Sequence, residues 1–296
     1  MSEKKFRSGF VAILGRPNVG KSSIMNRIVG EKVAIVSNHP QTTRSKLLGV
    51  ATGPDWHLVF VDTPGLHKPR TKLGEYMMKS ASDAREGVDA VLAVVDGQRI
   101  GGGDRAVLSD IQSMNCPRFL AVNKIDVVPP EKLMPQLAEL NEFHFDQIFS
   151  VSARTGENID LLTQKLIEAM PEGPKYFPDD MITDQPERVM CAEIIREKAL
   201  NNRRDEIPHG VGVEMLQIKK VSDNLTEIHA NVYCEKESHK SIILGKQGAM
   251  LGRIGSQARV DIERLLGTKV MLKLWVKVRL DWRNRAGDLR TLGYED

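Results

Sequence analysis

The sequence predicts an α/β domain with a doubly wound, mostly parallel sheet over its first 170 residues, followed by a smaller α+β domain. Short apolar runs alternate with amphipathic segments from residue 9 to about 170. This alternation is typical of buried parallel strands joined by helices. A stretch with three prolines and a glycine follows at residues 170–180, and beyond it the order of elements changes.

The elements of both domains follow from the spacing of apolar residues. Apolar runs predict five buried strands, at residues 9–14, 57–62, 88–96, 118–124 and 147–153. A more polar strand is expected at a sheet edge, near 45–52. The helices between or after the strands are predicted at 20–29, 72–86, 103–114, 131–142 and 157–169. The second domain is predicted as α-β-β-α-α-β, at residues 187–200, 211–220, 225–235, 239–244, 249–266 and 269–280.

Length and composition further limit the possible domain organisation and class of protein. The 296 residues predict two domains, at 1–170 and 183–296, joined by a linker at 171–182. A net charge of +3 neither demands nor excludes a nucleic-acid partner. Three cysteines without a CxxC pair argue against a disulfide framework or a zinc site. No apolar run approaches the ~18 residues of a membrane span.

A phosphate-binding loop follows the first predicted strand. Residues 15–22 fit GxxxxGK[ST] between a strand and a helix, which is the context that this motif requires. Backbone N–H groups and the helix N-terminus favour a phosphate there. Lys21 is expected to reach the β- and γ-phosphates, and the Ser22 hydroxyl to bind Mg²⁺. The phosphate-binding candidates are Gly15, Arg16, Pro17, Asn18, Val19, Gly20, Lys21, Ser22 and Ser23.

Three more motifs end predicted strands and point to a guanine nucleotide. Asp126, in NKID, is expected to accept hydrogen bonds from guanine N1–H and N2–H₂, a pair that adenine lacks. Asp62, in DTPG, is expected to hold Mg²⁺ through water, and the Gly65 amide to sense the γ-phosphate. The remaining candidates of these motifs are Thr63, Pro64, Asn123, Lys124, Ser152, Ala153 and Arg154, where Lys124 would stack on the base and a backbone amide of residues 152–154 would meet guanine O6.

The catalytic machinery of this predicted GTPase looks different from that of small signalling GTPases. A threonine is expected to close over Mg²⁺; Thr43 is slightly favoured, and Thr42 is kept as the alternative. Leu66 occupies the position of the water-orienting glutamine, and an aliphatic side chain cannot orient water. We therefore expect slow hydrolysis, with K⁺ held by Asn18 supplying the missing charge. The alternative, that Asn18 only caps the loop, stays open.

A GxxG turn inside the second domain predicts RNA binding. It joins two predicted helices in the element order of a type II KH module, and residues 236–290 carry 13 Lys and Arg against 5 Asp and Glu. The RNA-binding candidates are Lys240, Gly245, Lys246, Gln247, Gly248 and Arg253. Ile242, Ile243, Leu244 and Ile254 are candidates for an aliphatic base surface, although helical apolar spacing is more often core. Lys273, Lys277 and Arg279 share one face of the last strand, which is either solvated or RNA-lining.

Strings along the whole chain resemble the Era family of bacterial GTPases. They include GRPNVGKS, QTTR, DTPGLHKP, NKID, SAR, EIIREK and IILGKQGAMLGRIG. The resemblance implies a P-loop GTPase domain followed by a type II KH domain, with Mg²⁺ as cofactor and GTP and GDP as ligands. It also implies a monomer that binds the 3′ region of 16S rRNA and acts in 16S rRNA processing and 30S subunit biogenesis.

The resemblance implies a cytoplasmic protein with some association at the inner membrane face, although the sequence shows no anchor for it. Two rival functions stay open. One is an RNA-binding protein whose GTPase fold no longer hydrolyses GTP; Leu66, in place of a glutamine, is the feature that supports this alternative. The other is a membrane-linked signalling GTPase.

Overall fold

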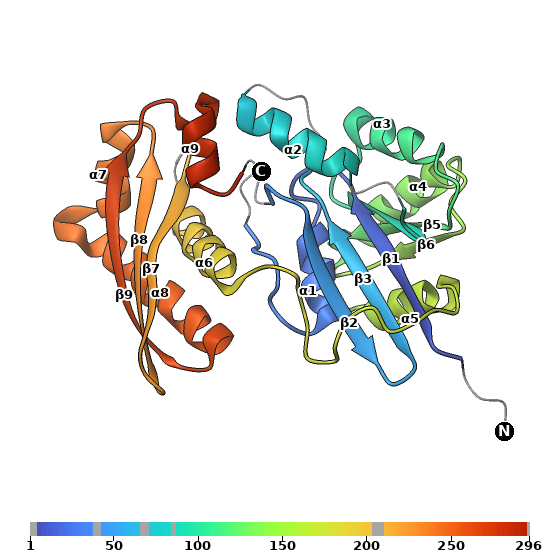
Figure 1. Cartoon of the computed structure of the whole chain (residues 1–296). Helices are drawn as coiled ribbons and strands as arrows, with labels where there is room; N and C mark the ends of the chain where they lie inside the picture. Colours follow the sequence, from blue (N-terminus) through green and yellow to red (C-terminus); the bar gives the residue numbers. More distant parts are fainter. Residues whose placement is uncertain (1–4, 38–42, 66–70, 84–86, 203–209, 295–296) are drawn as a thin grey trace. The chain divides into compact units, whose positions relative to one another are not determined.

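The computed structural model describes residues 5–37, 43–65, 71–83, 87–202 and 210–294. Contacts divide the chain into two compact units, the first built mainly from residues up to Asp184 and the second mainly from Gln185 onward (Figure 1). Each unit has its own hydrophobic core. No helix in the described ranges is long and apolar enough to cross a membrane.

The first unit contains a six-stranded sheet in the order β2-β3-β1-β4-β5-β6. The strands are β1 (Arg7–Leu14), β2 (Leu47–Gly53), β3 (Trp56–Asp62), β4 (Ala90–Asp96), β5 (Arg118–Asn123) and β6 (Gln147–Ser150). All neighbours pair in parallel except β2 and β3, which form an antiparallel pair at one edge. The predicted polar edge strand is therefore confirmed as β2.

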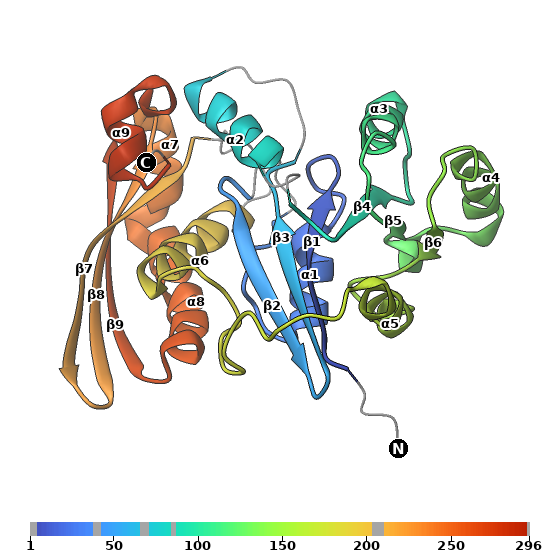
Figure 2. The same ribbon diagram turned by 45° about the vertical axis from the view of Figure 1, so that its right-hand side comes forward.

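Helices cover both faces of this sheet, which confirms the doubly wound fold (Figure 2). α1 (Lys21–Val29) and α5 (Ile159–Ala169) pack on one face, and α3 (Gly102–Ile111) and α4 (Pro130–Leu140) pack on the other. α2 (Lys72–Asp83) and a 3₁₀ turn, η1 (Ile125–Val127), complete the elements of this part of the chain. Both faces are buried, so the central strands are apolar at nearly every position.

The parallel arrangement brings the carboxyl ends of β1, β3, β4 and β5 to one edge of the sheet. Asp62 ends β3, Asp96 ends β4 and Asn123 ends β5, as the sequence predicts for Asp62 and Asn123. β6 ends at Ser150, three residues earlier than predicted, so residues 152–154 lie in the following loop. Ligands of open α/β sheets bind at such an edge.

The segment that the sequence predicts as a linker makes hydrogen bonds to the first unit. Ser8 Oγ donates to the Pro174 carbonyl at 2.6 Å, and the rings of Phe10 and Tyr176 lie 5.1 Å apart. Further along, the Val50 amide of β2 donates to the Ile182 carbonyl at 2.9 Å, and Thr183 Oγ1 donates to the Leu48 carbonyl at 2.7 Å. Residues 182–184 therefore bond to the edge strand β2, whose outer side would otherwise lack a hydrogen-bonding partner, and residues 174 and 176 contact β1.

The second unit packs helices against one face of a three-stranded sheet in the order β7-β8-β9. Its elements are α6 (Glu187–Asn201), β7 (Gly212–Ser222), β8 (Leu225–Cys234), α7 (Glu237–Leu244), η2 (Lys246–Gly248), α8 (Ala249–Leu266), β9 (Lys269–Val278), η3 (Trp282–Asn284) and α9 (Ala286–Thr291). β7 and β8 form an antiparallel hairpin, and β9 returns parallel to β8. The predicted α-β-β-α-α-β order is confirmed. η3 and α9 were not predicted, because six residues are too few to show a helical period.

Candidate functional site

The loop between β1 and α1 surrounds the Lys21 side chain. Lys21 Nζ donates to the carbonyl oxygens of Gly15 and Arg16, each at 3.2 Å, and the residue is only 6% exposed. Burial lowers the pKa of Lys21, while the nearby charge of Asp62 raises it. A buried ammonium group whose bonds to the described residues go to loop carbonyls is well placed to meet an anionic ligand.

The end of β3 lies against the same loop. A Cβ at Gly65 would approach the backbone nitrogen of Pro17 within 2.5 Å, so any larger residue would push the two segments apart. Thr63 Oγ1 donates to the Ile13 carbonyl at 3.0 Å, which holds this segment beside β1. The Gly65 backbone is thereby fixed next to the phosphate loop. Leu66, which follows it, lies outside the described residues.

Ser22, Thr43 and Asp62 converge on one point beside Lys21. Ser22 Oγ donates to Asp62 Oδ2 at 2.5 Å, Thr43 Oγ1 donates to the same oxygen at 3.3 Å, and the two hydroxyls lie 3.0 Å apart. Asp62 is fully buried, and among the described residues its Oδ1 atom has no hydrogen-bond partner. Burial raises the pKa of Asp62, although Lys21 and the two hydroxyls lower it.

This oxygen cluster fits Mg²⁺. Two hydroxyls and a carboxylate are hard oxygen ligands of the kind that Mg²⁺ prefers, and Asp62 Oδ1 is a buried acceptor to which no described residue donates. The geometry includes Thr43, the favoured threonine of the sequence analysis. Its alternative, Thr42, lies outside the described residues.

The Asn123 side chain joins the phosphate loop to the loop after β6. Its Nδ2 donates to the Val19 carbonyl at 2.9 Å, and its Oδ1 accepts a hydrogen bond from the Ala153 amide at 3.0 Å. The residue is only 2% exposed. The side chain that the sequence assigns to guanine thus bonds to both neighbouring loops, and it fixes the distance between the phosphate and base regions.

Lys124 is held across the opening of the site by two partners. Its Nζ donates to the Asn18 carbonyl at 2.8 Å and to Asp96 Oδ2 at 2.6 Å. Lys124 also has a positive φ of 68°, which directs its side chain out of the strand path. Sequence reasoning missed Asp96, although its position as the last residue of a buried strand was a usable signal.

The two oxygens of Asp126 have different partners. Ser152 Oγ donates to Oδ1 at 2.8 Å, and Arg154 Nη1 lies 3.5 Å from Oδ2. The carboxylate is 11% exposed, whereas the Arg154 side chain is 80% exposed. An exposed guanidinium leaves such a position at little cost, so a ligand that offers two donors can take over the carboxylate.

A second missed residue supports the phosphate loop from α3. Asp104 is 3% exposed, and its Oδ2 accepts hydrogen bonds from the Gly101 amide at 3.0 Å and from Arg16 Nη1 at 3.3 Å. It therefore closes the first turn of α3 and anchors the Arg16 side chain. No motif marks this pair in the sequence, because the two residues lie 88 positions apart.

The GxxG turn of the second unit has the backbone that its glycines predict. Gly245, the cap residue after α7, has φ 70°, Gln247 has φ 52°, and Gly248, the cap residue before α8, has φ 79°. A side chain at Gly245 would also approach the Met250 amide nitrogen within 2.9 Å. Lys246 and Gln247 at the tip are exposed, as is Arg253 one turn into α8. The turn thus presents a lysine beside a helix N-terminus, which suits a phosphate.

A cavity of about 370 Å³ lies between α8 and β9, next to this turn. Its lining includes Gly252 and Gly255 of α8 and Leu272 and Leu274 of β9. The two glycines keep the helix face flat. The sequence offered Ile242, Ile243, Leu244 and Ile254 as candidates for the aliphatic surface, with the core as the alternative; the core alternative is confirmed for Ile243 and Ile254, which are fully buried. The helical spacing of apolar residues identifies the residues of a helix that face the core, and it contains no information about a groove between two elements.

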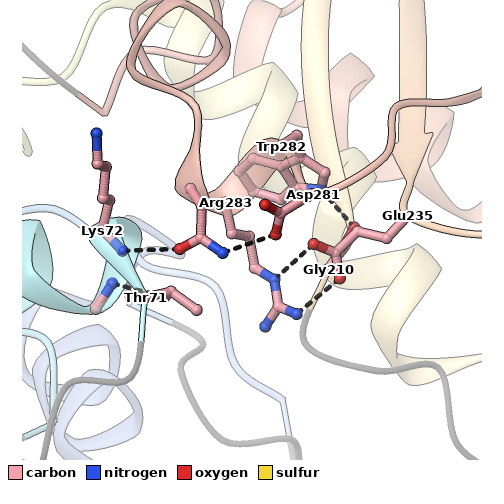
Figure 3. A network of polar contacts seen from close by, with 9 residues as sticks. Thr71, Lys72, Gly210, Glu235, Asp281, Trp282 and Arg283 are labelled. Atoms are coloured by element: carbon pink, nitrogen blue, oxygen red, sulfur yellow. Dashed lines mark hydrogen bonds and ion pairs between the residues drawn. The ribbon is translucent and has the colours of Figure 1, made fainter.

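A polar network closes one end of the second unit's sheet (Figure 3). Arg283 donates to both oxygens of Glu235, from Nε at 3.0 Å and from Nη2 at 2.7 Å. The fully buried Trp282 donates from Nε1 to the Gly210 carbonyl at 2.9 Å. The predicted strand extends to residue 280, but β9 ends at Val278 and these bonds hold the chain that follows it.

The fold and the two sites together define a class. The first unit has the phosphate loop, an oxygen cluster for a metal and a carboxylate for a guanine edge, and the second has the turn and element order of a KH domain. The molecule is thus a two-domain guanine-nucleotide-binding protein with a KH module.

Comparison with known proteins gives the family. Residues 10–124 match the family model described as 50S ribosome-binding GTPase, and residues 206–283 match the KH domain model. The chain is 52% identical over 293 residues to GTPase Era of Alkaliphilus metalliredigens, covering 98% of this chain and 99% of that one, and 50% identical over 295 residues to GTPase Era of Clostridioides difficile, covering 98% and 99%. The chain belongs to the Era family of GTPases.

Solved structures agree with this assignment. The crystal structure of Era in complex with MgGDPNP and nucleotides 1506–1542 of 16S ribosomal RNA superposes with a TM-score of 0.92 at 38% identity, covering 98% of this chain and 100% of that chain. The crystal structure of a point variant of Aquifex aeolicus Era bound to GDP·AlF4⁻ gives a TM-score of 0.92 at 37% identity, with the same coverage. The fold predicted from the sequence, a P-loop GTPase domain followed by a KH domain, is confirmed.

The first prediction concerns Asp126. In the Asp126→Asn variant, an amide replaces one acceptor, so it matches the C2 carbonyl of xanthine better than the amino group of guanine. We expect the GDP affinity of the variant to fall by about 100-fold, and its affinity for xanthosine diphosphate (XDP) to exceed its affinity for GDP. Fluorescent GDP and XDP analogues measure both, and Asp146→Asn, outside the site, is the control. An Asp126→Asn protein that still preferred GDP would refute the guanine-reading role.

The second prediction uses the raised pKa of Asp62. Mg²⁺ needs the ionised carboxylate, so its affinity should fall as pH drops through this raised pKa, by about tenfold per pH unit. The measurement is Mg²⁺ titration of the GDP complex between about pH 5 and 8. Asp62→Asn is the control, because the nucleotide phosphates still titrate in this variant while the carboxylate at position 62 is gone. If the wild-type protein and Asp62→Asn had the same Mg²⁺ affinity at every pH, the Asp62 carboxylate would have no role in Mg²⁺ binding.

Proposed function

We propose that this chain is a Mg²⁺-dependent GTPase that binds the 3′ region of 16S rRNA through its KH domain and acts in 30S subunit assembly. The observation that carries the proposal is the presence of both sites in one chain. The oxygen cluster of Ser22, Thr43 and Asp62 adjoins the phosphate loop, and the GxxG turn adjoins an apolar cavity. The related Era crystallised with MgGDPNP and with 16S rRNA supports the same pairing of ligands.

In the GTP site, the chain's own residues position the nucleotide. Lys21 would exchange its two carbonyl partners for phosphate oxygens. Ser22 and Thr43 would hold Mg²⁺, with Asp62 supporting it, and the ion would neutralise charge on the β- and γ-phosphates. Asp126 would bind the guanine edge, Lys124 would cover the base and Asn123 would fix the two loops around it. Gly65 would report the γ-phosphate to the residues that follow it.

In the KH domain, the RNA backbone would pass over the GxxG turn. Lys246 and the first turn of α8 would contact a phosphate, with Lys240 and Arg253 adding charge on either side. Unstacked bases would enter the cavity between α8 and β9, whose flat glycine face and leucines suit a planar ring. This assigns the base surface to Leu272 and Leu274 in place of Ile243 and Ile254.

Potassium is the proposed source of the charge that Leu66 leaves missing. Asn18 is exposed in the phosphate loop with φ 65°, a conformation that asparagine tolerates better than most residues. Its amide oxygen would hold K⁺ against the phosphates. The cytoplasmic location, the monomeric state and the association with the inner membrane face stay predictions from the family resemblance.

A third prediction tests hydrolysis. GTP turnover should be faster by about tenfold or more in K⁺ than in Na⁺ at equal ionic strength, and Asn18→Ala should remove this difference while GDP affinity stays within about threefold. Phosphate release over several turnovers is the measurement, and a catalytically silent wild-type protein would favour the rival without turnover. Equal rates in the two salts for the unmutated protein would end the potassium proposal.

A fourth prediction tests the KH site. Lys246→Asp with Gln247→Asp places two negative charges at the turn, where they oppose RNA phosphates but suit a helix N-terminus. We expect binding of a single-stranded 16S 3′-end oligonucleotide to fall by about 100-fold or more, with normal folding and normal RNA-free GTP hydrolysis. Measuring the RNA affinity at two salt concentrations gives the salt slope, which shows how many phosphate contacts the variant has lost.

The control for this pair is Lys220→Asp with Ser222→Asp. It changes the net charge equally at an exposed hairpin end. Undiminished affinity in the variant at residues 246 and 247, with an unchanged salt slope, would place the RNA elsewhere.

A further inference from the structure

The sheet of the second unit has one face that its core helices leave open. Val270 and Val276 of β9 belong to the core that the sheet forms with α6, α7 and α8. Side chains alternate along a strand, so the odd-numbered residues of β9 point to the other side of the sheet. Lys273, Trp275 and Lys277 all point there and are exposed. We call this surface, with Glu227 and His229 of β8, the Trp275 face.

The Trp275 face carries two lysines, and its glutamate is engaged by its neighbours. Register places His229 beside Lys273. Glu227 Oε1 accepts hydrogen bonds from Lys273 Nζ at 2.7 Å and from His229 Nε2 at 2.9 Å. The bond from Lys273, followed by the bond from His229, lowers the pKa of Glu227. The carboxylate is thus occupied by its neighbours, and Lys277 adds a further positive charge.

Trp275 stands on a rigid support. The ring is 43% exposed, and the His229 ring meets it edge-on with centroids 5.4 Å apart. Asn231, its neighbour across the strands, is 2% exposed and donates to Glu214 Oε2 at 2.9 Å. A large exposed ring held by ordered neighbours needs little further ordering when a second ring stacks on it.

We propose that the Trp275 face is a second RNA-binding surface, which stacks one base on Trp275 and contacts the flanking phosphates through Lys273 and Lys277. The proposal rests on the proposed RNA-binding function of the KH domain. Aromatic rings between cations are the pattern by which proteins hold single-stranded nucleic acid. Lysines are depleted at the core of protein–protein interfaces, so their position on both sides of Trp275 favours RNA over a protein partner.

The position of β9 in the sheet connects the two surfaces. The cavity beside the GxxG turn is lined by the inward residues Leu272 and Leu274, and the Trp275 face lies on the other side of the same strand. β9 is an edge strand of its sheet. An RNA strand leaving the cavity therefore has only the edge of β9 to pass before it reaches Trp275.

The test compares two single-stranded RNAs from the 16S 3′ region on the full chain. The short one has about six nucleotides, just more than the four that a KH turn clamps. The long one has about 14, within the site sizes of proteins that stack successive bases. The variants are Trp275→Ala, Trp275→Phe and Lys277→Gln, and Lys220→Gln at the hairpin end is the matched charge control.

We expect Trp275→Ala to weaken binding of the long RNA by about tenfold and to leave the short RNA unchanged. Trp275→Phe should keep most of the affinity, and Lys277→Gln should lower the salt slope for the long RNA by about one. Indole emission gives a direct readout. The long RNA should quench the fluorescence of the wild-type protein. It should still bind the Trp275→Phe variant, but without this quenching.

Four results would overturn the proposal. Long-RNA affinity unchanged in both Trp275→Ala and Lys277→Gln would leave the face to a protein partner. Equal loss for the two RNAs would mean a single site. A wild-type chain that bound neither RNA would refute the proposed function itself, and binding of the short RNA alone would refute only the second surface.

Discussion

The GTP site depends on one buried side-chain amide. Asn123 bonds to the phosphate loop through the Val19 carbonyl and to the loop after β6 through the Ala153 amide. Each bond is made inside the protein, where an unpaired amide would cost about 1–3 kcal/mol. The two loops come from opposite ends of the first unit's sequence and meet because parallel strands present their carboxyl ends at one edge. Without this connection, the phosphate and base regions would not keep a fixed separation.

The same edge concentrates charge that the fold stabilises poorly in the absence of a ligand. Lys21 and Asp62 are both buried, and burial shifts their pKa values in opposite directions, toward the neutral forms. No described residue donates a hydrogen bond to Asp62 Oδ1. A nucleotide with Mg²⁺ would supply opposite charges to both groups, so ligand binding would remove a cost that is already present in the protein.

The second unit achieves recognition through backbone shape. Positive φ at Gly245 and Gly248 turns the chain between two helices, and Gly252 and Gly255 then keep α8 flat beside β9. The edge strand β9 borders the cavity with one face and carries Trp275 on the other. One strand can therefore serve two surfaces, because successive side chains of a strand point to opposite sides.

The sequence by itself determined the element order, the strand ends that carry Asp62 and Asn123, and the family, because periodicity and short motifs are local properties of the chain. Only the tertiary structure decided the pairs made by residues far apart. These include Asp96 with Lys124, Asp104 with Arg16, and the bonds of residues 182–184 to β2. It also assigned Ile243 and Ile254 to the core and placed a cavity between α8 and β9. An apolar period shows that a residue is buried, but a groove exists only where two elements fail to fill the space between them.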